Sequence, residues 1–147
     1  MPDYQLPVAF YFKVIIDKVG TPLSFKEVSG LTTEMELENI QEGGANNYEY
    51  KLPKNLKHGN LVLKRALQPT KNQDVLWIKH IMEGDFIQPI VPRNIQIQLM
   101  DSDGKPIYTW LCTKAYPVKW DVEPLDSEKN SILIESIEFA YQTLIRS

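Results

Sequence analysis

The sequence predicts a mainly β domain with a single α-helix. Runs rich in aromatic and β-branched residues recur along the chain, and they are separated by glycine, proline, asparagine and aspartate. Between residues 72 and 84, by contrast, the apolar side chains repeat with the period of a helix. A chain of 147 residues is close to the usual size of one domain. We therefore expect one domain over residues 1–147.

The first strand is expected at residues 8–16, and we expect it to form a hairpin with the segment that follows. That segment, residues 23–47, reads as one long extended arm with a break at Ser29-Gly30 and a turn at Gly43-Gly44. In an extended strand, alternate side chains share a face, so Thr33, Met35 and Leu37 should lie opposite Glu34, Glu36 and Glu38. Three carboxylates on one face should border water, which is either bulk solvent or a wide lumen.

Residues 45–57 contain turn formers and show no period, so we expect a long loop there. Long loops in compact domains are often functional, which makes this one a candidate for contact with a partner. The next strand is expected at residues 59–66, with Leu61 and Leu63 on one face and Val62 and Lys64 on the other.

The helix is expected at residues 74–83, with Gly84 as its terminator. Thr70, Asn72 or Asp74 would cap its start. Its wide apolar stripe is most simply packed across the open side of a sheet or barrel, and the stripe consists of Val75, Trp77, Ile78, Ile81 and Met82.

A second hairpin is expected after a proline-containing loop at residues 85–93. Residues 94–100 alternate, residues 101–105 form an Asp-Gly turn, and residues 106–113 return as the partner strand. Residues 116–122 look like a bent continuation, because Pro117 cannot donate to a ladder. Residues 131–145 form a long last strand with a bulge as an option.

Composition excludes several classes of protein. The net charge of −3 argues against a general nucleic-acid binder, which displays a concentrated basic face. The lone Cys112 lies in a strand-like run, which indicates a buried, inert thiol and is compatible with a reducing cytoplasm. We find no signal peptide pattern and no apolar run long enough to span a membrane.

The sequence carries no catalytic or cofactor motif that we recognise, so we expect no enzyme activity and no cofactor. His58 and His80 have no second histidine or cysteine at ligand spacing, so neither indicates a metal site. The Asp101-Ser102-Asp103-Gly104 run starts like a calcium loop, but Cys112 occupies the twelfth position, where a calcium loop has glutamate. The aromatic residues, Trp77, Trp110 and Trp120 among them, are interpreted as core; the alternative is a surface for a ligand or glycan.

Several short motifs occur in a characteristic order along nearly the whole chain. They are Phe10-x-Phe12-x-Val14, Phe25-Lys26-Glu27-Val28-Ser29-Gly30-Leu31, Glu42-Gly43-Gly44, Leu52-Pro53, His58-Gly59-Asn60-Leu61-Val62-Leu63-Lys64-Arg65, Leu76-Trp77 and Ala115-Tyr116-Pro117-Val118-Lys119-Trp120. Their order and spacing resemble the tail tube protein family of contractile phages, which includes the inner tube proteins of extracellular contractile injection systems.

The resemblance implies a barrel-like protomer of two packed antiparallel sheets with one helix. Such protomers would join into hexameric rings, and the rings would stack into a hollow tube. A contractile sheath would enclose this tube, and a baseplate with tube-initiator proteins would nucleate it. Assembly in the bacterial cytoplasm and release as part of a phage tail or tail-like particle are implied with it, and the lumen would carry DNA or an effector cargo. Closed rings with two different faces leave no sheet edge exposed and can stack indefinitely.

The resemblance also suggests roles for particular residues. Glu34, Glu36 and Glu38 become candidates for the lumen wall, and Lys79 and Glu83 become candidates for the outer wall beside the sheath or a neighbouring subunit. Ring-to-ring contact is expected at the arm tip near Gly30 and Leu31 and at the loop that begins with Gly43, Gly44, Ala45, Asn46 and Asn47.

A soluble β-sandwich or barrel that binds a small ligand or glycan through its aromatic residues remains the alternative. The sequence does not distinguish a phage tail, a bacteriocin-like particle and an extracellular injection system, nor a main tube subunit from a terminal variant.

Overall fold

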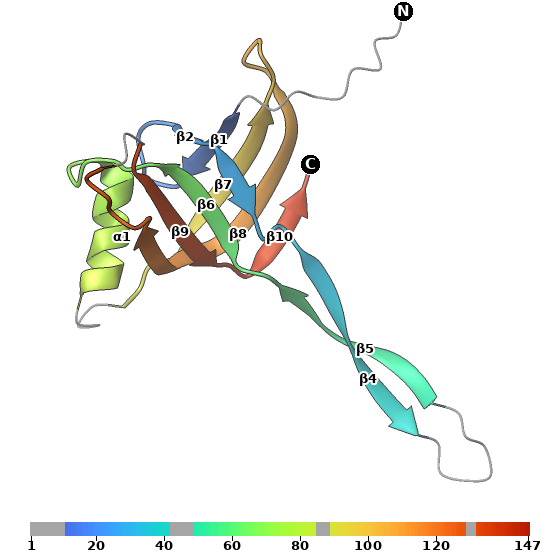
Figure 1. Cartoon of the computed structure of the whole chain (residues 1–147). Helices are drawn as coiled ribbons and strands as arrows, with labels where there is room; N and C mark the ends of the chain where they lie inside the picture. The colour runs from blue at the N-terminus through green and yellow to red at the C-terminus, as the bar shows by residue number, and fades with distance from the viewer. Residues whose placement is uncertain (1–10, 42–48, 85–88, 129–131) are drawn as a thin grey trace, which may run out of the picture.

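The computed structural model describes residues 11–41, 49–84, 89–128 and 132–147, and it shows a strand-rich body from which a two-stranded arm projects (Figure 1). The predicted first and second strands are present as β1 (Tyr11–Ile16) and β2 (Leu23–Phe25), which form the expected antiparallel hairpin. The arm breaks where the sequence predicted, because β3 (Glu27–Ser29) ends before Gly30 and β4 (Thr33–Gln41) starts a separate sheet.

The prediction of a loop over residues 45–57 is wrong for residues 49–57, which are the part of it that the structure describes. Residues 49–58 form β5 (Glu49–His58), which pairs with β4 along its whole length. A β-bulge sets Lys54 and Asn55 opposite the single residue Glu36, and Pro53 lies beside this irregularity. Proline is tolerated there because β5 is an edge strand of a two-stranded sheet.

The remaining strands form one sheet in the order β2-β1-β7-β8-β9-β6-β3, with β10 on β8. They are β6 (Leu61–Ala66), β7 (Arg93–Met100), β8 (Pro106–Val122), β9 (Ile134–Ala140) and β10 (Thr143–Arg146). The first and last strands of this order, β2 and β3, are separated in sequence only by Lys26, whose N–H donates to the carbonyl of Lys64 at 3.0 Å. The sheet therefore curls until its two ends meet, which confirms the barrel-like fold.

The 17-residue strand β8 belongs to both packed halves of the barrel. Its first part pairs with β7 and β10, and its second part pairs with β9. The change occurs near Lys114, which has a positive φ of 51°, so the predicted bent continuation is confirmed. The predicted last strand is interrupted at Tyr141 and Gln142, because its partner β8 passes from one half to the other at this point.

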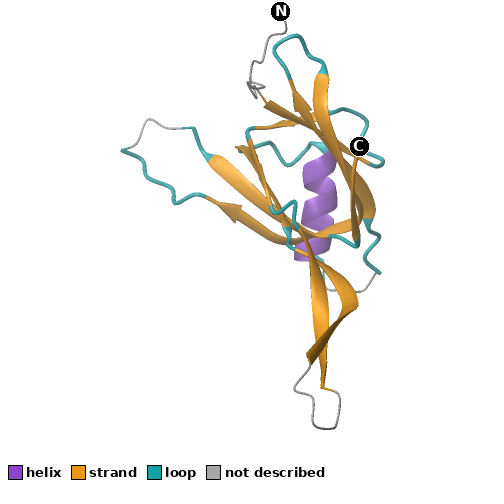
Figure 2. Cartoon of the chain, turned by 90° about the vertical axis from the view of Figure 1, so that its right-hand side faces the viewer, coloured by secondary structure: helices purple, strands orange, loops and turns teal. Residues whose placement is uncertain are grey.

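The helix α1 (Gln73–Glu83) packs over the open side of the barrel, as predicted (Figure 2). Val75, Trp77 and Ile78 are buried, and the Trp77 ring stacks on Phe139 with centroids 6.0 Å apart. Met82 was predicted to share this face, but it is 38% exposed, because it lies in the last turn, beyond the edge of the core. Asn72 is the N-cap residue, although its side chain donates to Gln68 instead of capping the helix.

Two predicted surfaces are confirmed on the body. Leu61 and Leu63 point into the core while Val62 and Lys64 alternate outward, and Cys112 is fully buried. Trp110 and Trp120 pack against the same core, so these aromatic side chains fill the interior and do not line a ligand surface. In the described part of the chain, no helix is long and apolar enough to cross a membrane.

Candidate assembly surfaces

The β4–β5 arm exposes both of its faces to solvent. Met35, Leu37 and Leu56 lie on one face and are 53%, 52% and 61% exposed. Directly opposed residues in an antiparallel pair share a face, so Leu56 adds to the apolar side across from Met35. Two-stranded ribbons are marginally stable alone in water, and both edges of this one are open. A surface that covers one face of such a ribbon would therefore stabilise it.

The acidic row lies on the other face of the arm, as predicted from its alternation. Glu34, Glu36 and Glu38 are all exposed. Across the ribbon, Lys57 stands opposite Glu34, and Lys54 lies in the bulge opposite Glu36. The face therefore retains more acidic than basic side chains. Its position is on the projecting arm and not on the body.

The arm is anchored at its root by a compact set of contacts. Gly30 has a φ of 85°, and a Cβ added there would come within 1.7 Å of the Asn60 carbonyl oxygen. The Gly59 N–H donates to the Thr32 hydroxyl at 3.1 Å, and the Tyr141 hydroxyl donates to the Gly30 carbonyl at 3.2 Å. The His58 ring lies 5.2 Å from that of Tyr141, centroid to centroid. These contacts fix where the arm leaves the barrel.

This arrangement corrects one predicted placement. Gly30 and Leu31 were expected at the tip of the arm, but they lie at its root, because the chain turns there from β3 into β4. Leu31 packs against the core. The other ring-stacking candidates, Gly43, Gly44, Ala45, Asn46 and Asn47, lie outside the described residues, so their role remains a prediction.

The outer face of the helix presents the predicted pair Lys79 and Glu83, which form an ion pair one turn apart. Leu76 lies on the same exposed side and is 48% exposed. The pair is solvated, and isolated i,i+4 pairs of this kind contribute about 0.3–0.5 kcal/mol. The face is therefore available to a partner and adds little to the stability of the subunit.

A buried charge cluster joins the helix to the barrel. Arg65 on β6 is only 4% exposed and forms ion pairs with Asp74 at the helix start and Glu135 on β9. Glu135 also accepts hydrogen bonds from the indole N–H of Trp120 and the backbone N–H of Gln68. Sequence reasoning missed this cluster, because three charged residues on separate elements show no common spacing.

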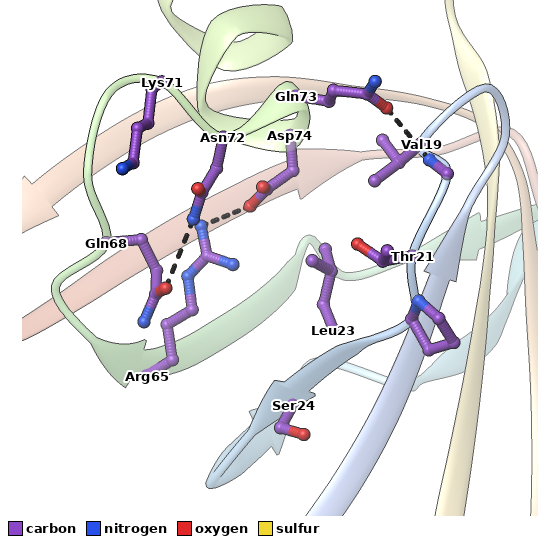
Figure 3. Close-up of a pocket in the computed structure, with 12 residues that line it drawn as sticks. Val19, Thr21, Leu23, Ser24, Arg65, Gln68, Lys71, Asn72, Gln73 and Asp74 are labelled. Atoms are coloured by element: carbon purple, nitrogen blue, oxygen red, sulfur yellow. Dashed lines mark hydrogen bonds and ion pairs between the residues drawn. The ribbon is translucent and has the colours of Figure 1, made fainter.

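Arg65 and Asp74 of this cluster line a pocket of about 590 Å³ between residues 19–24, which lead into β2, and residues 68–74, which lead into α1 (Figure 3). Within this pocket, Arg65 is paired with Asp74, Asn72 donates to Gln68, and Gln73 accepts from the Gly20 N–H. These contacts hold the helix start against the barrel, which is a structural task.

Other residues with chemical potential have structural surroundings too. Burial raises the pKa of the Cys112 thiol to about 12, so the thiolate needed of a nucleophile does not form near neutral pH. Asp101 accepts hydrogen bonds from the N–H groups of Asp103 and Lys105, which closes the hairpin turn. No group of three or more histidine, cysteine, aspartate or glutamate side chains suited to a metal ion occurs among the described residues.

Comparisons with known proteins agree with this arrangement. Residues 8–145 match the family model described as T4-like virus tail tube protein gp19. A search of curated proteins finds no match. Among solved structures, a chain of the six-fold symmetrised anti-feeding prophage baseplate is 26% identical, with 100% of this chain and 97% of that chain covered and a TM-score of 0.77.

Two further structures share the fold. A chain of the sheath-tube complex of the PVC extracellular contractile injection system, in the extended state, is 21% identical, with 99% and 93% of the two chains covered and a TM-score of 0.79. Hcp1 from Flavobacterium johnsoniae is 14% identical, with 94% and 95% covered and a TM-score of 0.56.

Proposed function

The chain belongs to the T4-like virus tail tube protein family and is a structural subunit of an inner tube, and we propose that it forms hexameric rings that stack into a hollow conduit. The family model spans nearly the whole chain, so the match includes both the body and the arm. The 26% identical relative occurs in a six-fold symmetrised baseplate, which supports six subunits per ring.

The observation that carries this function is the projecting arm. A closed barrel has no need of an additional ribbon, and the ribbon cannot bury Met35, Leu37 and Leu56 against its own body, from which it points away (Figure 1). Surfaces of this kind are covered by a neighbouring subunit. A contact between an arm and a different part of the next molecule is head-to-tail, and such contacts generate closed rings or open stacks.

The proposed partners follow from the place of a tube in a contractile particle. Copies of the same chain form the tube, a contractile sheath protein surrounds it, and baseplate and tube-initiator proteins start it. Structural relatives occur in a sheath-tube complex, a baseplate and a tube-terminating cap, which supports this list. Lys79 and Glu83 on the helix are the proposed outer-wall residues. The particle is a phage tail or an extracellular contractile injection system, assembled in the bacterial cytoplasm.

The lumen is proposed to carry DNA or an effector, and Glu34, Glu36 and Glu38 are proposed to line it. Their exposure and shared face support this assignment. Like charge along a wall discourages an anionic cargo from binding to it. The proposed tube works without catalysis, as a passive conduit within the sheath.

The test is the mass of the purified chain in solution over a concentration series, measured by light scattering. The proposal predicts a rise from the 17.0 kDa monomer to a hexamer and then to larger species. A chain that stays monomeric and binds glycans would contradict the tube and favour a binding module.

A further inference from the structure

An apolar groove of about 710 Å³ crosses the body where β6 ends and β9 begins. Its walls include Phe25, Ala66 and Ile134, and Ile132 stands at its side with 74% of its surface exposed. Two exposed charges are also part of its lining, Lys26 and Glu123. A volume in the range of about 300–1,000 Å³ is large enough for a sizeable ligand or several side chains.

The groove and the arm lie at opposite ends of the same strand. β6 begins just after the arm root and ends at Ala66 in the groove, and six residues of strand span about 20 Å. The arm leaves the body near the start of β6 and points away from the end of β6 and the start of β9 (Figure 1), where the groove lies. An arm therefore cannot fill the groove of its own chain.

The length of the groove matches the length of the apolar face of the arm. In the strand order, Lys26 adjoins β3 and Glu123 follows β8, so the groove crosses three strand spacings, or about 14 Å. On the arm, the face that carries the exposed apolar side chains extends from Met35 to Asn39, which spans about 13 Å.

The charges agree as well. The arm face that carries Met35, Leu37 and Leu56 has none of the three carboxylates, because Glu34, Glu36 and Glu38 point to the other side. Between Met35 and Asn39, the charged residue of this face is Lys51, which stands opposite Asn39 at the end farther from the root. Glu123 is the exposed acid of the groove. Burying the part of this face from Met35 to Asn39 therefore desolvates none of the three carboxylates of the acidic row and brings Lys51 and Glu123 together.

We propose that the groove receives the β4–β5 arm of a second copy of this chain. The apolar face of that arm packs on Ile132, above Ala66 and Ile134, and Lys51 lies beside Glu123. The acidic row, on the opposite face of the arm, remains exposed. This inference rests on the proposed tube function, and it names the surface through which one subunit contacts the next.

The lone native cysteine makes this contact accessible to disulfide mapping. Cys112 is fully buried, so cysteines introduced at exposed sites report without background. A chain with Leu37→Cys on the arm is mixed with a chain with Ile132→Cys in the groove, under conditions of assembly, and oxidised. The matched control replaces Ile132→Cys with Leu76→Cys, which is exposed on the helix.

The expected product is a disulfide-linked dimer of one arm variant and one groove variant, with loss of that product in the helix control. A chain that carries both Leu37→Cys and Ile132→Cys gives a ladder of linked chains, because a head-to-tail contact continues from copy to copy. Dimers from Leu37→Cys alone would indicate arm-to-arm pairing and would overturn the proposal.

Charge reversal tests the orientation of the arm in the groove, in which Lys51 lies beside Glu123. Glu123→Lys should raise the concentration needed for assembly by about tenfold or more, since like charges at an interface are strongly unfavourable. Adding Lys51→Glu to the same chain should restore it, whereas adding Lys54→Glu should not.

Electron microscopy of the same samples separates the two claims. Rings or tubes that form without the Leu37–Ile132 disulfide would overturn the groove assignment and leave the tube function intact. Samples with neither rings nor disulfide would count against both.

Discussion

Gly30 is the residue on which the exit of the arm depends. Its φ of 85° favours glycine, and the backbone carbonyl of Asn60 occupies the place of a side chain. Gly104 provides a matched control, because its φ of 77° is similar but nothing lies within 4 Å of an added Cβ.

We predict that Gly30→Ala lowers the free energy of unfolding by clearly more than Gly104→Ala does. The control change should cost about 1 kcal/mol from the strained φ alone, while Gly30→Ala adds a backbone clash. Urea unfolding of the two variants measures the difference. Equal losses would show that the approach to Asn60 is not tight.

Arg65 has a contrasting neighbour in Lys64. Arg65→Met should lower the free energy of unfolding by about 3–5 kcal/mol, because it leaves Asp74 and Glu135 buried without their cation. Lys64→Met removes a solvated pair with Glu27 at 3.8 Å and should change stability by less than about 1 kcal/mol. Similar values for the two variants in urea unfolding would contradict the role given to the buried cluster.

The Cys112 thiol gives a prediction for the dependence of stability on pH. Burial raises its pKa from 9.0 to about 12, so folding favours the neutral form. The resulting stability is fully present below pH 9 and is lost as the pH rises toward 12. The stability difference between the native chain and Cys112→Ala should therefore shrink above pH 9, measured by urea unfolding at each pH. A difference that does not change with pH would be incompatible with this burial.

We expect the arm to be needed for assembly but not for folding of the body. Thr32 and Gly59 at its root are joined by a hydrogen bond of 3.1 Å, so residues 33–58 can be replaced by a short glycine linker. We expect this variant to keep a thermal midpoint within a few degrees of the native chain, since the arm packs little against the core, and to stay monomeric. Circular dichroism and light scattering measure both properties. A variant that still forms rings would show that the arm is dispensable.

Most elements were predictable from sequence because the pattern of apolar and polar residues within each one is typical of a single type of secondary structure. The hairpin at residues 93–113 alternates cleanly, and the helix shows its period and its terminal glycine. β5 was missed because its turn formers Pro53 and Asn55 outweigh a weak alternation, and only pairing with β4 makes it a strand. The buried ion cluster was missed for a related reason, since pairing between elements distant in sequence leaves no local pattern.

The proposed lumen wall of the assembled tube can be tested by removing its negative charges. Replacing Glu34, Glu36 and Glu38 together with glutamine should leave ring assembly unchanged, because the acidic face is not the one proposed to be buried. Retention of an anionic cargo should increase, most clearly at low salt, where charges are least screened. Cargo retention that is unchanged at several salt concentrations would remove these residues from the lumen.

The contacts of the exposed surfaces, including the outer surface of the helix, form only in the assembly. The structure of one chain shows which surfaces are exposed, and membership of the family shows that the chain is a tube subunit. The sequence predicted the barrel with one helix, but it did not reveal the groove, because the residues that line it come from five separate segments.

Negative-stain electron microscopy of the purified chain over a concentration series shows whether the chain forms rings and tubes. We predict rings with a central hole at moderate concentration and stacked tubes at high concentration. Fields of single compact particles at every concentration, with the arm intact, would contradict it.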